Sequence, residues 1–366
     1  QAAKTVSANG FSYSKKMTMT ATAYSAFNKS GKYGKTASGM TARYGIVAVD
    51  PKVIPLGTKL YVDGYGYESF DEALADAEDG SVIVLLADVN ADEIVKLEKA
   101  VTLDLNGFAL TSTATKAIEV YVDATIKNGT VTGAQRAVDT RKAVTLNLEN
   151  VELATTATAV NTQPLTIGGS ENGTVVNVKD STIDAGNAGY GIITFVESDI
   201  NVENTEISGY AALYFKEGSA NTTATVDSAS VLNGAGHAGE RFGAIVTEET
   251  DITVTVDGTI NMAEVAGANN MAIVFKGEAA NNAVALNGAV NGAIIDKYTE
   301  DATVTTTNAD VAEAIKKIVE ASSIKEHTYN LGTGWMCTDT LYNMACKVIK
   351  IGKEFGYTNS SIIKED

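Results

Sequence analysis

Apolar and polar residues alternate in short runs that recur through most of the chain. One copy reads VTLDLNGFAL at 101–110, a second reads VTLNLENVEL at 144–153, and a third reads ITVTVDGTI at 252–260. In each copy, two alternating stretches flank an Asn or Asp. A period of two is typical of β-strands, whose successive side chains point to opposite faces. The pattern therefore predicts short strands joined by turns.

The Asn or Asp between the two stretches marks the repeat. These markers are Asn106, Asn128, Asn150, Asp180, Asn204, Asp227, Asp257 and Asn287. Their spacing is 22, 22, 30, 24, 23, 30 and 30 residues, which fits a coil with insertions on one side. Short amide and carboxylate side chains bond to nearby backbone and tolerate left-handed geometry. We predict turns at the markers, and a hydrogen-bonded ladder if the turns align.

Each repeat also contains a further apolar stretch outside the marker phrase. They occupy 191–195, 211–215, 243–246, 271–275 and 292–295. Two or three short strands per repeat predict a mainly β fold, a right-handed parallel β-solenoid that covers residues 68–308. Its inward side chains should stack from coil to coil in one core. The residues that we expect to be buried there are Leu105, Leu148, Val178, Val202 and Val256.

The segments next to the repeats have a helical pattern. At 69–79, apolar residues share one face and acidic residues occupy the first turn, so a short helix should precede a strand at 81–86. Apolar stripes at 310–322 and 339–357 predict two more helices. We interpret the first helix as an entrance cap and residues 309–366 as a helical C-terminal cap.

Composition narrows the class of protein. The formal net charge is -17 over 366 residues, which argues against a nucleic-acid partner because phosphate binding needs a basic face. No stretch reaches the roughly 18 apolar residues of a membrane span. A chain that begins at Gln1 is compatible with processing during export. Cys337 and Cys346 are either a disulfide or two ordinary thiols.

Residues 17–67 do not show the sequence pattern of the repeats. They contain MTMTATAY at 17–24, TASG at 36–39 and GIVAVDPKVIPLGTKLYVDGYG at 45–66. These phrases closely resemble the first half of the bacterial 3D domain, named for three conserved aspartates. The resemblance implies a double-psi β-barrel module at 1–67. It also implies a place among the peptidoglycan-cleaving lytic transglycosylases and wall proteins of Gram-positive bacteria and their phages.

The chain departs from that family after Tyr67. The family continues with a glycine-rich phrase that carries its catalytic aspartate, whereas this chain enters the predicted helix at 69–79. Of the three aspartates, only the first has a counterpart, Asp50. Glycan cleavage by general acid chemistry needs a second, positioned carboxyl group. We therefore interpret Asp50 as a turn residue that closes a strand at 46–49, and we expect no lytic activity from it.

Half of a barrel should leave strand edges unpaired. The edges belong to expected strands at 18–24, 46–49 and 59–62. Exposed edges pair with other strands, so we predict a homo-oligomer, either a closed dimer or an open filament. Residues 1–14 are a candidate donor strand. Alternatively, strands of the same chain close the fragment.

Other candidate sites are sparse. The two histidines, His237 and His327, lack neighbouring ligands with metal-site spacing, and we expect no metal or cofactor. No phosphate-binding loop or catalytic-serine motif occurs.

Parallel β-helices include polysaccharide lyases and hydrolases, whose sites gather Asp, Arg and Lys on neighbouring coils. Arg136, Arg141 and Lys142 near Asp139 are candidates for a sugar-facing patch, as is Arg241 beside a glutamate. A solvated loop is the simpler interpretation of both groups.

Together these features favour an exported, non-catalytic structural or adhesive protein at the cell surface, with cell-wall glycan as a possible partner. The alternatives are an enzyme that cleaves peptidoglycan or another polysaccharide, and a glycan-binding module of a wall or phage protein.

Overall fold

The computed structural model describes residues 69–156, 162–186, 189–236, 241–263, 269–276, 279–294 and 302–322, and four short strands nearer the ends. The chain divides into two compact units, Gln1–Glu72 and Ala73–Asp366. In the first unit, β1 (Val6–Ala8) and β2 (Phe11–Tyr13) form an antiparallel hairpin. Near the C-terminus, β28 (His327–Asn330) pairs in parallel with β29 (Ser360–Ile363).

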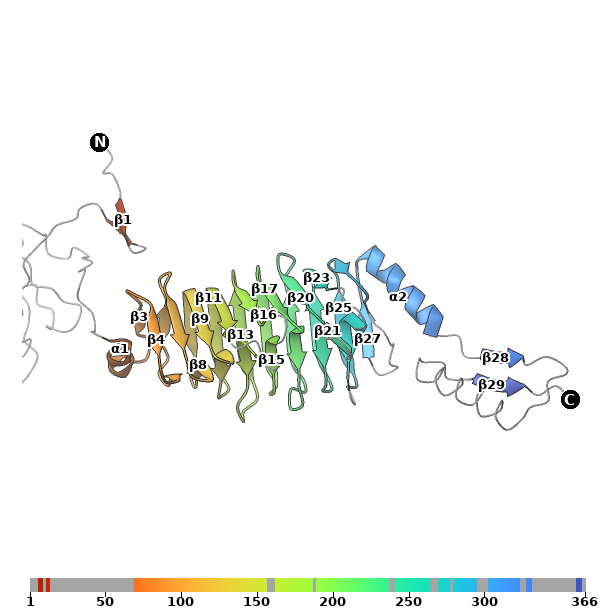
Figure 1. Ribbon diagram of the computed structural model, residues 1–366, viewed down its shortest axis with the longest axis horizontal. Helices are drawn as coiled ribbons and strands as arrows, with labels where there is room; N and C mark the ends of the chain where they lie inside the picture. Colours follow the sequence, from red (N-terminus) through yellow and green to blue (C-terminus); the bar gives the residue numbers. More distant parts are fainter. Residues whose placement is uncertain are drawn as a thin grey trace, which may run out of the picture. The chain divides into compact units, whose positions relative to one another are not determined.

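Most of the second unit is a parallel β-solenoid, whose coils stack from β3 to β27 (Figure 1). Each full coil supplies three strands, and each strand pairs in parallel with its equivalents in the coils on either side. The strands therefore form three rows. The predicted mainly β, parallel solenoid fold is confirmed.

The first row contains β3 (Val82–Val84), β6 (Thr102–Asp104), the first halves of β9 (Ala124–Gly133) and β11 (Thr145–Thr155), β13 (Thr174–Lys179), β16 (Ser198–Glu203), β19 (Thr223–Val226), β22 (Thr253–Val256), β25 (Asn282–Leu286) and β27 (Ala302–Thr305). The second row contains β4 (Val89–Ala91), β7 (Ala109–Ser112), the second halves of β9 and β11, β14 (Thr182–Asp184), β17 (Glu206–Gly209), β20 (Val231–Gly234), β23 (Thr259–Met262) and β26 (Val290–Asn291). The third row contains β5 (Val95–Leu97), β8 (Lys116–Val120), β10 (Arg136–Thr140), β12 (Leu165–Ile167), β15 (Tyr190–Thr194), β18 (Ala211–Phe215), β21 (Arg241–Thr247) and β24 (Asn269–Phe275).

The rows enclose one apolar core. All five residues chosen from the repeats lie in it and are at most 2% exposed, as predicted. Register explains this result. Ile126, Leu148 and Val178 are aligned partners on neighbouring coils, so each buried side chain stacks on an equivalent one. A period of two within strands and aligned register between them produce a continuous core.

The marker residues form the bend between the first and second rows. Five of them, Asn106, Asn128, Asn150, Asp180 and Asn204, have a left-handed backbone with φ between 42° and 60°. The last three markers also lie at bends, but their backbone is not left-handed. Asp227 instead opens a wider turn, in which its carboxylate accepts the Ser230 hydroxyl at 2.6 Å.

The predicted ladder of markers is confirmed in part. The Asn150 amide donates to Asn128 at 3.2 Å, and the Asn204 amide donates to Asp180 at 2.7 Å. Other ladders were not predicted. One of them runs along the first row, where Asn177 donates to Asn147 at 2.9 Å.

The helices next to the solenoid match the sequence pattern closely. Helix α1 (Phe70–Asp76) begins after Ser69, whose hydroxyl accepts the Glu72 N–H at 3.2 Å, and it ends earlier than predicted. Helix α2 (Ala309–Ser322) is capped by Asn308. The helix expected at 339–357 and the barrel strands expected before residue 67 lie outside the described residues.

Candidate functional site

The structure describes only some of the residues that the sequence pointed to. Asp50, His237, Cys337 and Cys346 lie outside the described residues. Arg241 is the first residue of β21, but its side chain is not described. The remaining candidates lie on and beside β10.

Arg136, Asp139 and Arg141 belong to a charged cluster that spans two coils. Strand β10 pairs with β8 so that Arg136 is aligned with Lys116 and Asp139 with Glu119. We use the name charged cluster for six residues of these two coils: Lys116, Glu119, Tyr121, Arg136, Asp139 and Arg141. Asp139 is fully buried, so the solvated loop expected from the sequence is wrong at this place. The pairing of β8 with β10 fixes the positions of these side chains. Ile118 and Val138, on the same two strands, are buried in the core and anchor them.

Asp139 is at the centre of the charged cluster. Its Oδ2 lies 2.6 Å from the Lys116 Nζ and 2.8 Å from the Arg136 Nη1. The Arg141 Nη1 lies 3.7 Å from the same oxygen. The other oxygen, Oδ1, has no hydrogen-bond partner among the described residues. One buried carboxylate therefore holds three cations in place.

Glu119 is the second carboxylate of the cluster. It accepts hydrogen bonds from the Lys116 ammonium at 2.6 Å and from the Tyr121 hydroxyl at 2.8 Å. Burial acts to raise the pKa of Glu119. The hydrogen bonds from Lys116 and Tyr121, with the charges of Lys116 and Arg141, outweigh burial and lower the pKa below its usual value.

This arrangement is poorly suited to acid catalysis. A general acid for glycan cleavage needs a carboxyl group with a raised pKa. Glu119 has a lowered pKa, so it is ionised at neutral pH. The charged cluster is better suited to hold cationic side chains rigidly at the surface than to donate a proton.

Sequence reasoning found half of the charged cluster. Lys116, Glu119 and Tyr121 were missed because they precede β10 by one coil. A spacing of 20 residues separates Lys116 from Arg136 and Glu119 from Asp139, and this repeat of charges was the available signal. Lys142 is not a member of the cluster, because it pairs with Glu171.

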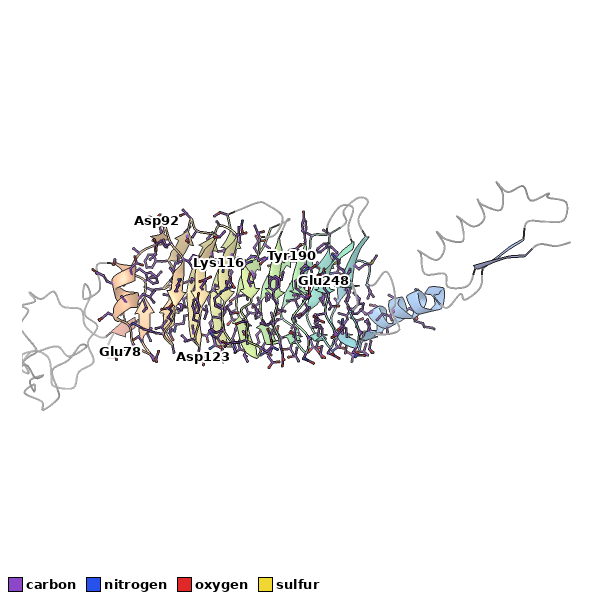
Figure 2. All side chains as sticks on the ribbon, turned by 90° about the horizontal axis from the view of Figure 1, so that it is seen from below. Glu78, Asp92, Lys116, Asp123, Tyr190 and Glu248 are labelled. Atoms are coloured by element: carbon purple, nitrogen blue, oxygen red, sulfur yellow. The ribbon has the colours of Figure 1, made fainter. Side chains whose placement is uncertain are left out.

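Figure 2 labels Lys116, Tyr190 and Glu248, which lie one after another along the solenoid on the third row or directly after it. These three side chains are therefore spread over several coils of the solenoid.

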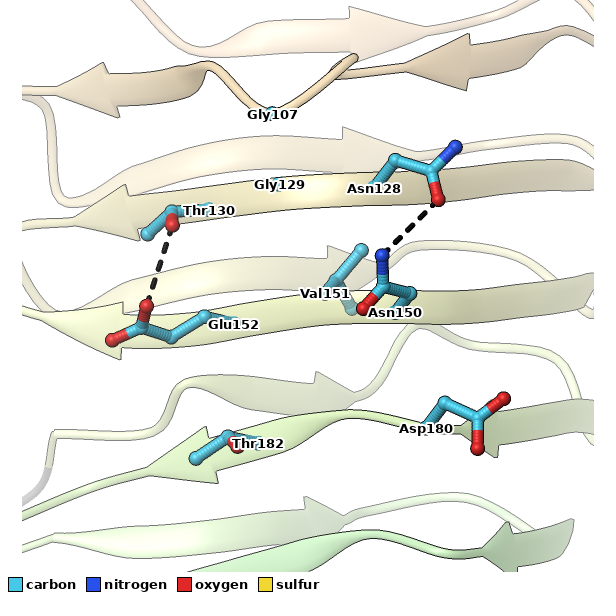
Figure 3. Close-up of a pocket in the computed structure, with 9 residues that line it drawn as sticks. All are labelled: Gly107, Asn128, Gly129, Thr130, Asn150, Val151, Glu152, Asp180 and Thr182. Atoms are coloured by element: carbon cyan, nitrogen blue, oxygen red, sulfur yellow. Dashed lines mark hydrogen bonds between the residues drawn. The ribbon is translucent and has the colours of Figure 1, made fainter. Parts of the chain in front are cut away.

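A second surface feature is an open groove at the bend between the first and second rows (Figure 3). It is lined by Gly107, Asn128, Gly129, Thr130, Asn150, Val151, Glu152, Asp180 and Thr182. Gly129, in the lining of the groove, has to be a glycine, because a Cβ at this position would lie 2.4 Å from the Phe108 carbonyl oxygen. The polar groups here bond mainly to one another, as in the Asn128–Asn150 and Thr130–Glu152 pairs. The lining of the groove contains no aromatic ring and no cation.

The described residues contain no group of three or more His, Cys, Asp and Glu side chains arranged to hold a metal ion. Within the same part of the chain, no helix has the length and apolarity that a membrane span requires.

Two curated proteins of Bacillus subtilis (strain 168) are similar to a short part of this chain. The cell wall-binding protein YocH is 53% identical over 57 residues, which are 14% of this chain and 20% of YocH. The putative cell wall shaping protein YabE is 47% identical over 66 residues, 17% of this chain and 16% of YabE. The chain thus covers a fifth or less of either relative. No family model and no solved structure matches the chain.

Proposed function

We propose that this chain is an exported, non-catalytic structural or adhesive protein of the cell surface, held at the cell wall through residues 1–67. The observation that carries the proposal is the local similarity to two proteins named for the cell wall. The matches are 57 and 66 residues long, close to the length of the segment 17–67 that resembles a 3D domain. The solenoid is then an arm that this module attaches to the wall.

Two observations favour a non-catalytic role. The module has only Asp50 as a counterpart of the three family aspartates. On the solenoid, the carboxylates of the charged cluster are bound to cations, and the pKa of Glu119 is lowered rather than raised. Neither site offers the paired acid and base that glycoside hydrolysis needs.

Co-sedimentation with purified Bacillus cell walls tests the proposal. The full chain should pellet with the walls, and a chain that lacks residues 1–67 should remain in the supernatant. Circular dichroism must show that the truncated chain keeps its β structure, which the separate second unit leads us to expect. Equal pelleting of both proteins would refute attachment through the N-terminal module.

A further inference from the structure

Four aromatic rings gather on the outer side of the third row. Tyr190 and Phe242 are stacked, with centroids 5.8 Å apart and an interplanar angle of 17°. Tyr214 meets Tyr190 edge-on at 4.8 Å, and Tyr210 lies 6.0 Å from Phe242. Phe242 and Tyr214 are buried, whereas Tyr190 and Tyr210 are half-buried. The two buried rings thus pack against the two partly accessible rings.

A small residue allows this stacking. Tyr190 lies on β15 and Phe242 on β21, and β18 runs between these strands. Ala211 of β18 is the aligned partner of Tyr190 and is fully buried. Its methyl group leaves room for the two rings to meet across β18. The Lys276 Nζ lies 3.9 Å from the Phe242 ring centroid, a cation–π contact that fixes this lysine beside the rings.

Tyr214 of the aromatic group lies on the same register line as Glu119 and Asp139 of the charged cluster. Parallel pairing aligns Glu119, Asp139, Thr166, Ile193 and Tyr214 on successive strands. Neighbouring strands are about 4.8 Å apart, so the line from β8 to β24 covers about 29 Å. We call this line and the charged and aromatic side chains beside it the outer strip.

Cations are the more accessible charges of the outer strip. The Arg136 and Arg141 side chains are 28% and 37% exposed, while their partner Asp139 is 0% exposed. Lys216 is likewise more exposed than its partner Glu248. Among the described side chains, the strip holds five cations and three carboxylates, a net charge of +2 in a chain of -17. Its accessible surface is thus positive on an otherwise acidic protein.

We propose that the outer strip binds an acidic polysaccharide built of pyranose rings. The C–H faces of sugar rings carry partial positive charge and pack against the negative faces of aromatic rings, here Tyr190 and Tyr210. Carboxylates on the sugar pair with guanidinium groups such as Arg141. Arg136 is on β10 and Tyr190 is on β15, so one extended polymer can reach both kinds of contact. This site goes beyond the wall attachment proposed above and uses a different part of the chain.

Calorimetric titration of the full chain tests the proposal with two matched probes. One probe is a β-1,4-linked hexamer of glucuronic acid, and the other is cellohexaose, which has the same backbone without carboxylates. We expect the acidic hexamer to bind at least tenfold more tightly. Tyr190→Leu keeps an apolar side chain but removes the ring, and Arg141→Gln removes a cation. Each should weaken binding of the acidic hexamer about tenfold.

Lys179→Gln is the matched control. Lys179 is an exposed cation of the first row, paired with Glu203, and its replacement should leave binding unchanged. The proposal is overturned if the acidic hexamer does not bind, or if Tyr190→Leu and Arg141→Gln bind it as tightly as the parent. It is also overturned if Tyr190→Leu dissociates an oligomer in light scattering, since the strip would then be an interface between copies. Because cell-wall pelleting is tested separately, failure here leaves the wall attachment standing.

Discussion

Asn150 and Asp180 occupy the same turn position on neighbouring coils, yet their side chains do not bond to each other. Each asparagine of this ladder donates its amide toward the preceding coil, as Asn150 does to Asn128. An ionised aspartate has no donor. Asp180 therefore accepts from Asn204 and stops the ladder there.

Asp180→Asn should stabilise the solenoid. An asparagine at this position could accept from Asn204 and also donate to the Asn150 side-chain oxygen. One added hydrogen bond contributes about 1 kcal/mol to the free energy of unfolding. Chemical denaturation of both proteins measures it. Asp92→Asn, at an exposed carboxylate of the first coil, controls for the lost charge. Equal gains from the two substitutions would mean that charge, not the ladder, is responsible.

Asp139→Asn should destabilise the chain strongly. The substitution keeps the volume but removes the buried charge that neutralises Lys116, Arg136 and Arg141. Breaking a buried pair costs about 3 kcal/mol or more. Combining it with Lys116→Met removes one of the uncompensated cations, so the double variant should lose less than the sum of the single losses. Simple additivity in denaturant unfolding would show that the pair is not coupled.

The effect of Glu119→Gln should depend on pH. The folded-state pKa of Glu119 lies below the reference value of 4.5, so its ionised form stabilises the fold above that pH. This stability is lost as the pH falls through the folded-state pKa. We expect the difference in Tm between parent and variant to be largest near pH 7 and to shrink below pH 4.5. Glu98→Gln, at an exposed position after β5, is the control for the loss of one charge. A difference that stays constant down to pH 3 would contradict the assigned network.

Asp50 should not support glycan cleavage. The chain lacks the phrase that carries the catalytic aspartate of the 3D family. Incubation with purified peptidoglycan should release no soluble muropeptides above a buffer control. Release by the parent protein that disappears in Asp50→Asn would overturn this prediction.

The N-terminal module should mediate self-association. We expect the full chain to form dimers or larger assemblies at high concentration, and removal of residues 1–16 to reduce the mass measured by light scattering. The hairpin of β1 and β2 lies inside the removed segment. This hairpin means that part of the proposed donor already pairs with itself. A full chain that stays monomeric would refute the prediction.

Local patterns were sufficient to predict the solenoid. Alternation selects strands, and the markers place the bends, because both properties depend on residues close in sequence. Asp227, Asp257 and Asn287 also occupy bends, but without a left-handed backbone. Asp227 opens a wider turn. Asp257 is followed by Gly258, where a Cβ would lie 2.3 Å from the Ser230 carbonyl oxygen.

The sequence by itself determined the period of the coils, the inward residues and the local resemblance of residues 17–67. Only the tertiary structure decided which charges and rings meet. Asp139 and Lys116 are 23 residues apart, and Tyr190 and Phe242 are 52 apart. Each pair meets because the strands that carry the two residues are aligned in parallel register. That register depends on the summed packing of all coils, which no local pattern encodes.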